Sequence, residues 1–285
     1  MSVLHDILHF VRWRLIAIRY AGKVGALFSR NALSHTPPKT AAVQRIRLEG
    51  HDAGPNIPPQ QVEQITAIYR PRIAGVATPG EGHPFVNLFR AEDIAADNPV
   101  LRLAFSPAVL DLADDYFAGH LVLDSIQVLY SWPGEGTALR ESQMWHKDYG
   151  DSKSFHWIAY LNDVMGPEDG PFSFIDKVDA RRISRSAFIR RIADQTFARE
   201  LGDGQVRQFL GRAGESIFVD PATCYHSGSR CKNPRLAIFV TFNTDRPFVS
   251  PVPIVRVNRE RIADVARQVR PDLNYPYLSR LLQLH

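Results

Sequence analysis

Short segments in which apolar and polar residues alternate fill the chain from residue 121 onward. This feature of the sequence constrains the possible folds most strongly. Alternation with a period of two is typical of strands that bury one face, and turn residues separate the segments. The expected strands lie at residues 121–131, 155–161, 171–175, 216–220, 235–243 and 249–257. One helix, near residues 184–200, interrupts the series. Strands in series with so few helices between them predict a sandwich or jelly roll and not a Rossmann sheet.

Helices and connections are expected on both sides of this β-rich part. Residues 59–70 and 106–117 have helical patterns, and residues 259–283 read as one or two closing helices. Turn-rich linkers lie at residues 34–39 and 52–59. The predicted fold class is therefore mainly β with flanking helices around a jelly-roll core.

The N-terminal segment is basic. Residues 1–40 contain six basic side chains and one acidic one, which leaves 28 basic and 29 acidic residues in the rest of the chain. As a helix, residues 3–30 would place Arg12, Arg19, Lys23 and Arg30 on one face and apolar residues on the other. Such a helix could rest on an anionic membrane surface, or pack on its own domain with a solvated basic face, and a transit peptide is a third alternative. We expect residues 1–40 to be a helix and linker, followed by one domain at residues 41–285.

Bulk properties point to an ordinary globular protein. Hydrophobic residues make up 45% and charged residues 22% of the 285 positions, which is sufficient for a buried core. Two cysteines are too few for a disulfide framework, and we expect a cytoplasmic protein, with peripheral membrane contact through residues 3–30 as an option. Basic and aromatic residues are not interleaved in the way that nucleic-acid-binding proteins show, so we do not expect nucleic-acid binding.

Two histidines and one aspartate have the chemistry of an iron site. His146 and Asp148 lie two residues apart, so an extended segment points both side chains the same way, and His226 would come from a strand 80 residues later. Two histidines and a carboxylate hold Fe(II) on one face and leave the other face open for a cosubstrate and dioxygen. Because the chain contains 10 histidines, the tripeptide His146-Lys147-Asp148 alone is weak support for an iron site. The neighbours Trp145 and Tyr149 are expected to point away, toward packing.

Two further residues are candidates for cosubstrate binding. Arg235 shares a predicted strand face with Ala237, and a buried arginine there needs an anion, such as the C5 carboxylate of 2-oxoglutarate. A surface ion pair at a strand start is the alternative. Gln127 could hydrogen-bond the cosubstrate or be a half-buried polar strand residue.

Other chemically active residues are assigned ordinary roles. Cys224 and Cys231 flank His226 and are expected to be inert, and His156 is expected to be a satisfied core histidine. The basic tract at residues 177–191 could be a lid that binds an anionic substrate group, or a solvated helix.

An ordered set of motifs between residues 85 and 250 resembles the phytanoyl-CoA dioxygenase family of Fe(II)- and 2-oxoglutarate-dependent oxygenases. The set is Trp145-His146-Lys147-Asp148, Tyr160-Leu161-Asn162-Asp163-Val164, Gly170-Pro171, Gly214-Glu215-Ser216-Ile217-Phe218-Val219-Asp220, His226-Ser227-Gly228 and Asn233-Pro234-Arg235. The resemblance implies a double-stranded β-helix of the cupin-like type.

The same resemblance implies roles for single residues. His146, Asp148 and His226 would be the iron ligands, Arg235 would anchor the cosubstrate carboxylate, and Gln127 lies where relatives bring a glutamine toward the cosubstrate. Halogenating relatives have a small residue at the position of Asp148, so hydroxylation of a small, anionic or lipid- or carrier-linked substrate is predicted. The alternatives are a non-catalytic jelly-roll protein docked by its N-terminal helix and a cupin-type metal protein that does not use 2-oxoglutarate.

Overall fold

The computed structural model describes residues 2–22, 24, 36–76, 84–134, 139, 141–183 and 190–284. The described helices are α1 Ser2–Ala21, α2 Ala41–Glu49, α3 Pro59–Ile73, α4 Pro99–Ala104, α5 Leu112–Tyr116, α6 Asp194–Leu201, α7 Pro253–Val257, α8 Arg259–Val269 and α9 Tyr275–Leu282. The described strands are β1 His51–Ala53, β2 Phe85–Asn87, β3 Leu121–Ser131, β4 Ser154–Tyr160, β5 Phe172–Phe174, β6 Arg207–Phe209, β7 Ser216–Val219, β8 His226–Ser227 and β9 Arg235–Thr244.

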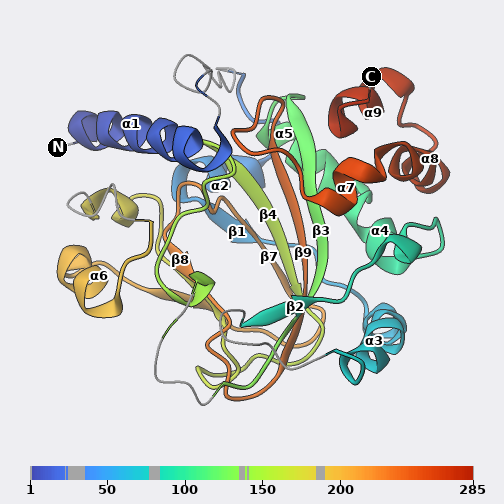
Figure 1. Ribbon diagram of the computed structural model, residues 1–285, viewed down its shortest axis with the longest axis horizontal. Coiled ribbons are helices and arrows are strands. Elements are labelled where there is room, and N and C mark those ends of the chain that lie inside the picture. Colours follow the sequence, from blue (N-terminus) through green and yellow to red (C-terminus); the bar gives the residue numbers. More distant parts are fainter. Residues whose placement is uncertain are drawn as a thin grey trace.

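Two antiparallel sheets form the core of the fold. The larger has the strand order β1-β7-β4-β9-β3-β2, and the smaller has the order β6-β5-β8. The smaller sheet packs against one face of the larger through a cluster that contains Ile158, Phe172, Phe174 and Val219. Helices α3, α4, α8 and α9 lie on the other side of the larger sheet (Figure 1). This is the predicted jelly-roll core with flanking helices, the architecture of a double-stranded β-helix.

The larger sheet is held to the helical layer by apolar side chains. Strand β4 sends Phe155, Trp157 and Ala159 into the main core, where all three are fully buried. Their neighbours along the strand, including His156 and Ile158, point the opposite way because side chains alternate across a strand. The alternation expected from the sequence therefore separates a packing face from a face that looks into the jelly roll.

Local sequence signals set several helix ends. The side chain of Thr40 accepts a hydrogen bond from the amide of Val43 and caps α2, and Asn98 does the same for Val100 at the start of α4. Helix α2 ends at Gly50, whose φ of 94° is unfavourable for a residue with a side chain. A Cβ at this position would also collide with the sulfur of Cys224.

Three expectations about elements need correction. Residues 249–257 were predicted as a strand, but they form an irregular segment followed by helix α7, because Pro251 and Pro253 remove two of the amide donors a strand needs. The expected helix at 106–117 begins as a π-helical turn at Pro107–Asp111 before α5. The short strands β1, β2, β6 and β8 were not predicted, since two or three residues are too few to establish a period.

The N-terminal helix ends at Ala21, and most of residues 23–35 lie outside the described residues. Arg12 was expected on the exposed basic face of the helix, either solvated or on a membrane surface. Instead it is 2% exposed, and its Nη1 donates a hydrogen bond of 2.6 Å to the hydroxyl of Tyr225. The apolar side of the helix faces solvent. Among the described residues, no helix is both long and apolar enough to cross a membrane.

Candidate metal centre

A pair of backbone hydrogen bonds brings the two predicted histidine ligands together. The amide of His146 donates to the carbonyl of His226 at 3.0 Å, and the amide of His226 donates back at 2.8 Å. His226 belongs to β8, which pairs with β5 in the smaller sheet. Main-chain hydrogen bonds thus hold two segments 80 residues apart side by side. The two imidazole rings lie next to each other, with centroids 4.1 Å apart.

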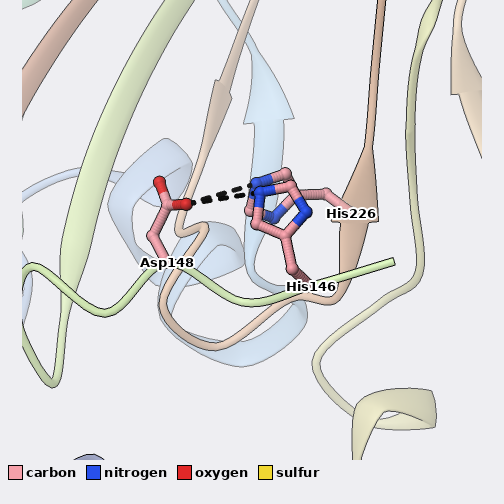
Figure 2. A group of neighbouring side chains, drawn as sticks. All are labelled: His146, Asp148 and His226. Carbon is pink, nitrogen blue, oxygen red and sulfur yellow. Dashed lines mark ion pairs between the residues drawn. The ribbon is translucent and has the colours of Figure 1, made fainter. Parts of the chain in front are cut away.

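Asp148 completes a three-residue cluster with these histidines. One of its carboxylate oxygens, Oδ1, lies 3.6 Å from Nε2 of His146 and 3.6 Å from Nε2 of His226. Figure 2 shows the carboxylate pointing at both rings. Two ligand atoms that each lie about 2.0–2.2 Å from one ion are at most about 4.4 Å apart. The separations therefore suit three donors around a single metal ion.

Both rings are oriented by hydrogen bonds at their other nitrogen. Nδ1 of His146 lies 2.8 Å from the carbonyl of Met144, and Nδ1 of His226 lies 3.2 Å from the carbonyl of Cys224. A carbonyl can only accept, so Nδ1 carries the proton and Nε2 presents its lone pair. This outer support of metal-binding histidines fixes both the tautomer and the ring orientation.

The charges of the cluster are those of a ligand set that is ready for a metal. Burial, reinforced by the neighbouring imidazole of His226, holds the pKa of His146 well below its usual range. Burial alone would raise the pKa of Asp148, but the surrounding imidazoles, that of His226 foremost, outweigh it and hold that pKa well below its usual range. A neutral imidazole and an ionised carboxylate are the forms that bind metal ions.

A cavity of about 250 Å³ adjoins Asp148. Its lining is rich in hydroxyl, amide and carboxyl groups: Asp124, Ser125, Gln127, Asp148, Tyr149, Gly150, Ser154, His156, Thr241, Asn243, Val249, Ser250 and Val252. Gln127, a predicted site residue, therefore lies on the cavity wall. The contribution of residues 249–252 to the cavity was not predicted, since the irregular segment that brings them there was expected to be a strand.

His156 lies on the other side of Asp148 from the two candidate ligands. Its Nε2 is 3.4 Å from Oδ2 of Asp148, and burial lowers the pKa of His156 to about 4. Its Nδ1 is buried with no hydrogen-bond partner among the described residues. The expectation of a fully satisfied core histidine was wrong. The signal available in the sequence was its position between Phe155 and Trp157, whose burial in the core turns His156 toward the cavity.

Arg235 is buried, as predicted, and is 2% exposed. Its guanidinium donates to the carbonyl of Gly170 and to the hydroxyls of Ser131 and Ser229, the last at 2.9 Å, and none of these partners is an acid. Its Nε is buried with no partner among the described residues. Ser229 has a φ of 58°, a strained value for a residue other than glycine that places its hydroxyl beside the guanidinium.

A glycine lies beside the guanidinium of Arg235. Gly228 follows His226 by two residues, and a Cβ there would lie in ordinary contact, 3.9 Å from both terminal nitrogens of Arg235.

The flanking aromatic residues behave differently from each other. Trp145 packs away from the site and stacks on Phe197 with ring centroids 4.0 Å apart, as expected. Tyr149 was expected to do the same, but it lines the cavity, and the guanidinium of Arg190 lies 4.1 Å from the centre of its ring. The end of the basic tract thus reaches the rim of the cavity, while residues 184–189 of that tract lie outside the described residues.

The two cysteines are buried free thiols. Burial raises the pKa of Cys224 to about 12, so its sulfur stays protonated at neutral pH. Since only a thiolate is a strong metal ligand, Cys224 adds nothing to the cluster.

Comparisons with known proteins give the fold a context. No family model matches the sequence, and no curated protein matches it either. Among solved structures, EctD from S. alaskensis has a TM-score of 0.54 at 16% identity, covering 77% of this chain and 84% of its own. The carbocyclase SnoK from nogalamycin biosynthesis, described as alpha-ketoglutarate dependent, has a TM-score of 0.52 at 18% identity, covering 79% and 94%. The epimerase SnoN, solved with Fe3+, alpha-ketoglutarate and nogalamycin RO, has a TM-score of 0.52 at 17% identity, covering 74% and 86%. At these identities, the likeness establishes the fold.

Proposed function

We propose that this protein is an Fe(II)- and 2-oxoglutarate-dependent oxygenase that hydroxylates a small polar substrate. The observation that carries the proposal is the convergence of His146, Asp148 and His226, each histidine presenting Nε2 while a main-chain carbonyl holds its Nδ1. Two imidazoles and one carboxylate suit Fe(II) and leave coordination positions free. SnoN and SnoK, which share the fold, are described as alpha-ketoglutarate-dependent enzymes.

The donor set fits the metal by its chemistry, and Arg235 fits the cosubstrate. A buried guanidinium with two hydroxyls beside it and an Nε that has no partner among the described residues is suited to a carboxylate. We assign the distal carboxylate of 2-oxoglutarate to Arg235, with Ser131 and Ser229 holding the guanidinium in place. Gln127, on the same wall as Ser125, is proposed as a lesser cosubstrate contact. When bound, iron and 2-oxoglutarate supply the oxidising power that activates dioxygen to attack a C–H bond.

The chain's own residues orient and shield this chemistry. His156 faces the second oxygen of Asp148 and would fix which oxygen turns toward the metal. Phe172 covers the ring of His226, with centroids 5.3 Å apart, and limits the access of water from that side. An ionised Asp148 also favours hydroxylation over halogenation, because its carboxylate would hold the metal where a halide would otherwise bind.

The substrate proposal follows from the cavity. Hydroxyl and amide groups on its wall, such as those of Ser125, Thr241 and Asn243, suit a substrate with several hydrogen-bonding groups. Arg190 at the rim offers one place where an anionic group could bind. The basic tract led us to expect an anionic substrate. We retain this as a proposal for one anionic group of the substrate, which would bind at the rim of the cavity. Membership in the phytanoyl-CoA dioxygenase family is likewise proposed, on the motif order alone.

An anaerobic titration tests the iron and cosubstrate assignments. We expect Fe(II) followed by 2-oxoglutarate to produce the weak visible charge-transfer band of the chelate in the wild type and no band in His226→Ala. His120→Ala, which removes a surface histidine paired with Asp245, is the matched control and should keep the band. Metal binding without a band in the wild type would favour a cupin-type protein that does not use 2-oxoglutarate. Failure of the folded wild type to bind Fe(II) would leave the non-catalytic alternative.

A further inference from the structure

Helix α1 turns an apolar face to solvent. Six of its large apolar side chains are exposed: Val3 70%, Leu4 64%, Ile7 53%, Phe10 51%, Val11 39% and Leu15 49%. At 3.6 residues per turn these six positions fall within an arc of about 140°. Single exposed apolar residues are ordinary on a protein surface, but a contiguous stripe of this kind marks a surface that is covered by something else.

The opposite side of α1 fixes the helix to the body of the protein. Arg12 and Ile16 are buried at 2% and 8% exposure, and both lie about 100° or more from the centre of the apolar stripe. The hydrogen bond from Arg12 to Tyr225 anchors the helix next to His226. In Figure 1 the helix lies along the outside of the molecule, and no other described helix or strand covers its outer side. The helix is therefore held with its apolar side facing outward.

We propose that this outward face of α1 docks the protein on an anionic lipid surface. Charge favours this partner, because residues 1–40 contain six basic residues and one acidic residue while the rest of the chain is nearly balanced. Arg12 and Arg14 are buried, and Arg19 is the basic residue of α1 that is exposed. Arg19 is exposed at the edge of the stripe, where its guanidinium can reach lipid phosphates as the apolar residues enter the acyl region. Arg14 lies within the arc of the stripe but is only 7% exposed, and its guanidinium lies 3.2 Å from the centre of the Phe10 ring.

A second copy of the chain would suit this face less well. A dimer through α1 would bring two strongly basic N-terminal segments together, and like charges at an interface oppose association. An anionic membrane neutralises the same charges and offers apolar volume for all six side chains at once. The proposal does not depend on iron or 2-oxoglutarate, so it can fail while the oxygenase assignment stands.

Vesicle flotation with the full-length protein tests the proposal. We expect the wild type to float with vesicles of phosphatidylcholine containing about 30% phosphatidylglycerol, and much less with pure phosphatidylcholine. The triple variant Leu4→Gln, Ile7→Gln, Val11→Gln changes the centre of the stripe and should lower binding about tenfold or more, because each of the three side chains loses apolar burial in the lipid. Arg19→Gln should lower binding to the anionic vesicles alone.

The matched control makes the same chemical change elsewhere. Leu48, Met165 and Val257 are exposed at 63%, 57% and 76%, so Leu48→Gln, Met165→Gln, Val257→Gln removes an equal number of exposed apolar side chains. This control should bind vesicles like the wild type. Equal flotation of the two triple variants, or no flotation of the wild type, overturns the proposal. A wild-type dimer in solution that only the α1 variant converts to a monomer would instead assign the face to a second copy.

Discussion

The two faces of the six-stranded sheet are built from the same strands but differ in almost every physical property. The face toward the helices carries buried apolar side chains, such as Phe155, Trp157 and Phe242, in one continuous core. The face toward the smaller sheet carries Gln127, His156 and other polar groups around the cavity. Successive residues of a strand therefore serve stability and chemistry in turn.

Register keeps the two faces distinct. Ser125 pairs with Thr241 across β3 and β9, so two residues that line the cavity stand opposite each other. A shift of one residue would exchange the faces and bury the polar set in the helical core. The comparison predicts that substitutions on one face change stability and those on the other change binding, and each substitution below tests that separation.

Asp148→Ala should have the largest effect. The loss of the only carboxylate in the cluster should weaken Fe(II) binding by at least about 100-fold, since the loss of an outer-shell partner alone costs about 10- to 100-fold. The metal-free protein should unfold within a few degrees of the wild type, because no core side chain is removed. Calorimetric titration with Fe(II) and thermal melting measure the two effects.

Asp245→Ala is the control for Asp148→Ala. It breaks a surface pair in which Oδ2 of Asp245 lies 3.1 Å from Nδ1 of His120, and it should leave iron binding unchanged. Wild-type affinity for Fe(II) in Asp148→Ala would contradict the assignment of this carboxylate as a ligand.

Phe155→Ala tests the opposite face. Phe155 is fully buried and contacts the rings of Tyr116 and Phe218, and the cavity left by its ring should lower the free energy of unfolding by about 3–5 kcal/mol. Urea denaturation measures the loss. Iron affinity of the folded fraction should stay within about twofold of the wild type, and a large loss of affinity would break the separation between the faces.

The sequence predicted most of this separation, and a single bulge accounts for where it fell short. Alternation placed Ser125, Gln127 and Ser131 on one face, as the structure has them. Simple alternation would put Leu121 and Leu123 on that face too, yet both lie in the helical core because the register shifts between Leu123 and Ser125. Asp124 occupies the bulge and lines the cavity. No periodicity rule reveals a bulge before the partner strand is known.

The candidate site divides in the same way. Residue type and motif order were enough to group His146, Asp148 and His226, since only a few types of side chain bind metal ions. The alternation of Phe155, His156 and Trp157 was enough to turn His156 toward the cavity, but its nearness to Asp148 depends on how two separate segments pack. Tyr149 could not be placed, because it lies in an irregular segment without a period. The orientation of α1 was also beyond the sequence: a helical wheel gives two faces, but only the hydrogen bond from Arg12 to Tyr225 decides which one turns inward.

Arg235→Gln should have an intermediate effect, confined to the cosubstrate. The loss of a charge-assisted contact to a carboxylate is worth about 1.5–3 kcal/mol, so the Kd for 2-oxoglutarate should rise about 10- to 100-fold while iron binding is retained. Arg235→Lys keeps the charge but loses the two-pronged geometry of the guanidinium. Its Kd for 2-oxoglutarate should lie between those of the wild type and Arg235→Gln. Titration of the charge-transfer band gives the Kd values.

Arg45→Gln is the control for Arg235→Gln, because it removes an exposed arginine that pairs with Asp52. Its Kd for 2-oxoglutarate should equal that of the wild type. A normal Kd in Arg235→Gln would assign the cosubstrate carboxylate to a different residue.

Asp124→Asn should change stability by an amount that depends on pH. Burial, with the charges of Asp148 and Asp151, raises the pKa of Asp124 to about 7, whereas an unfolded chain titrates near its usual value of about 3.9. Between these values the folded state holds a proton that the unfolded state has lost, so wild-type stability falls as pH rises, by at most about 1.4 kcal/mol per pH unit. Asparagine cannot ionise, so the metal-free variant should gain stability over the wild type between pH 4 and 7. Urea midpoints that differ by the same amount at pH 4.5 and pH 7 would mean that Asp124 keeps an ordinary pKa and that the polar face tolerates its charge.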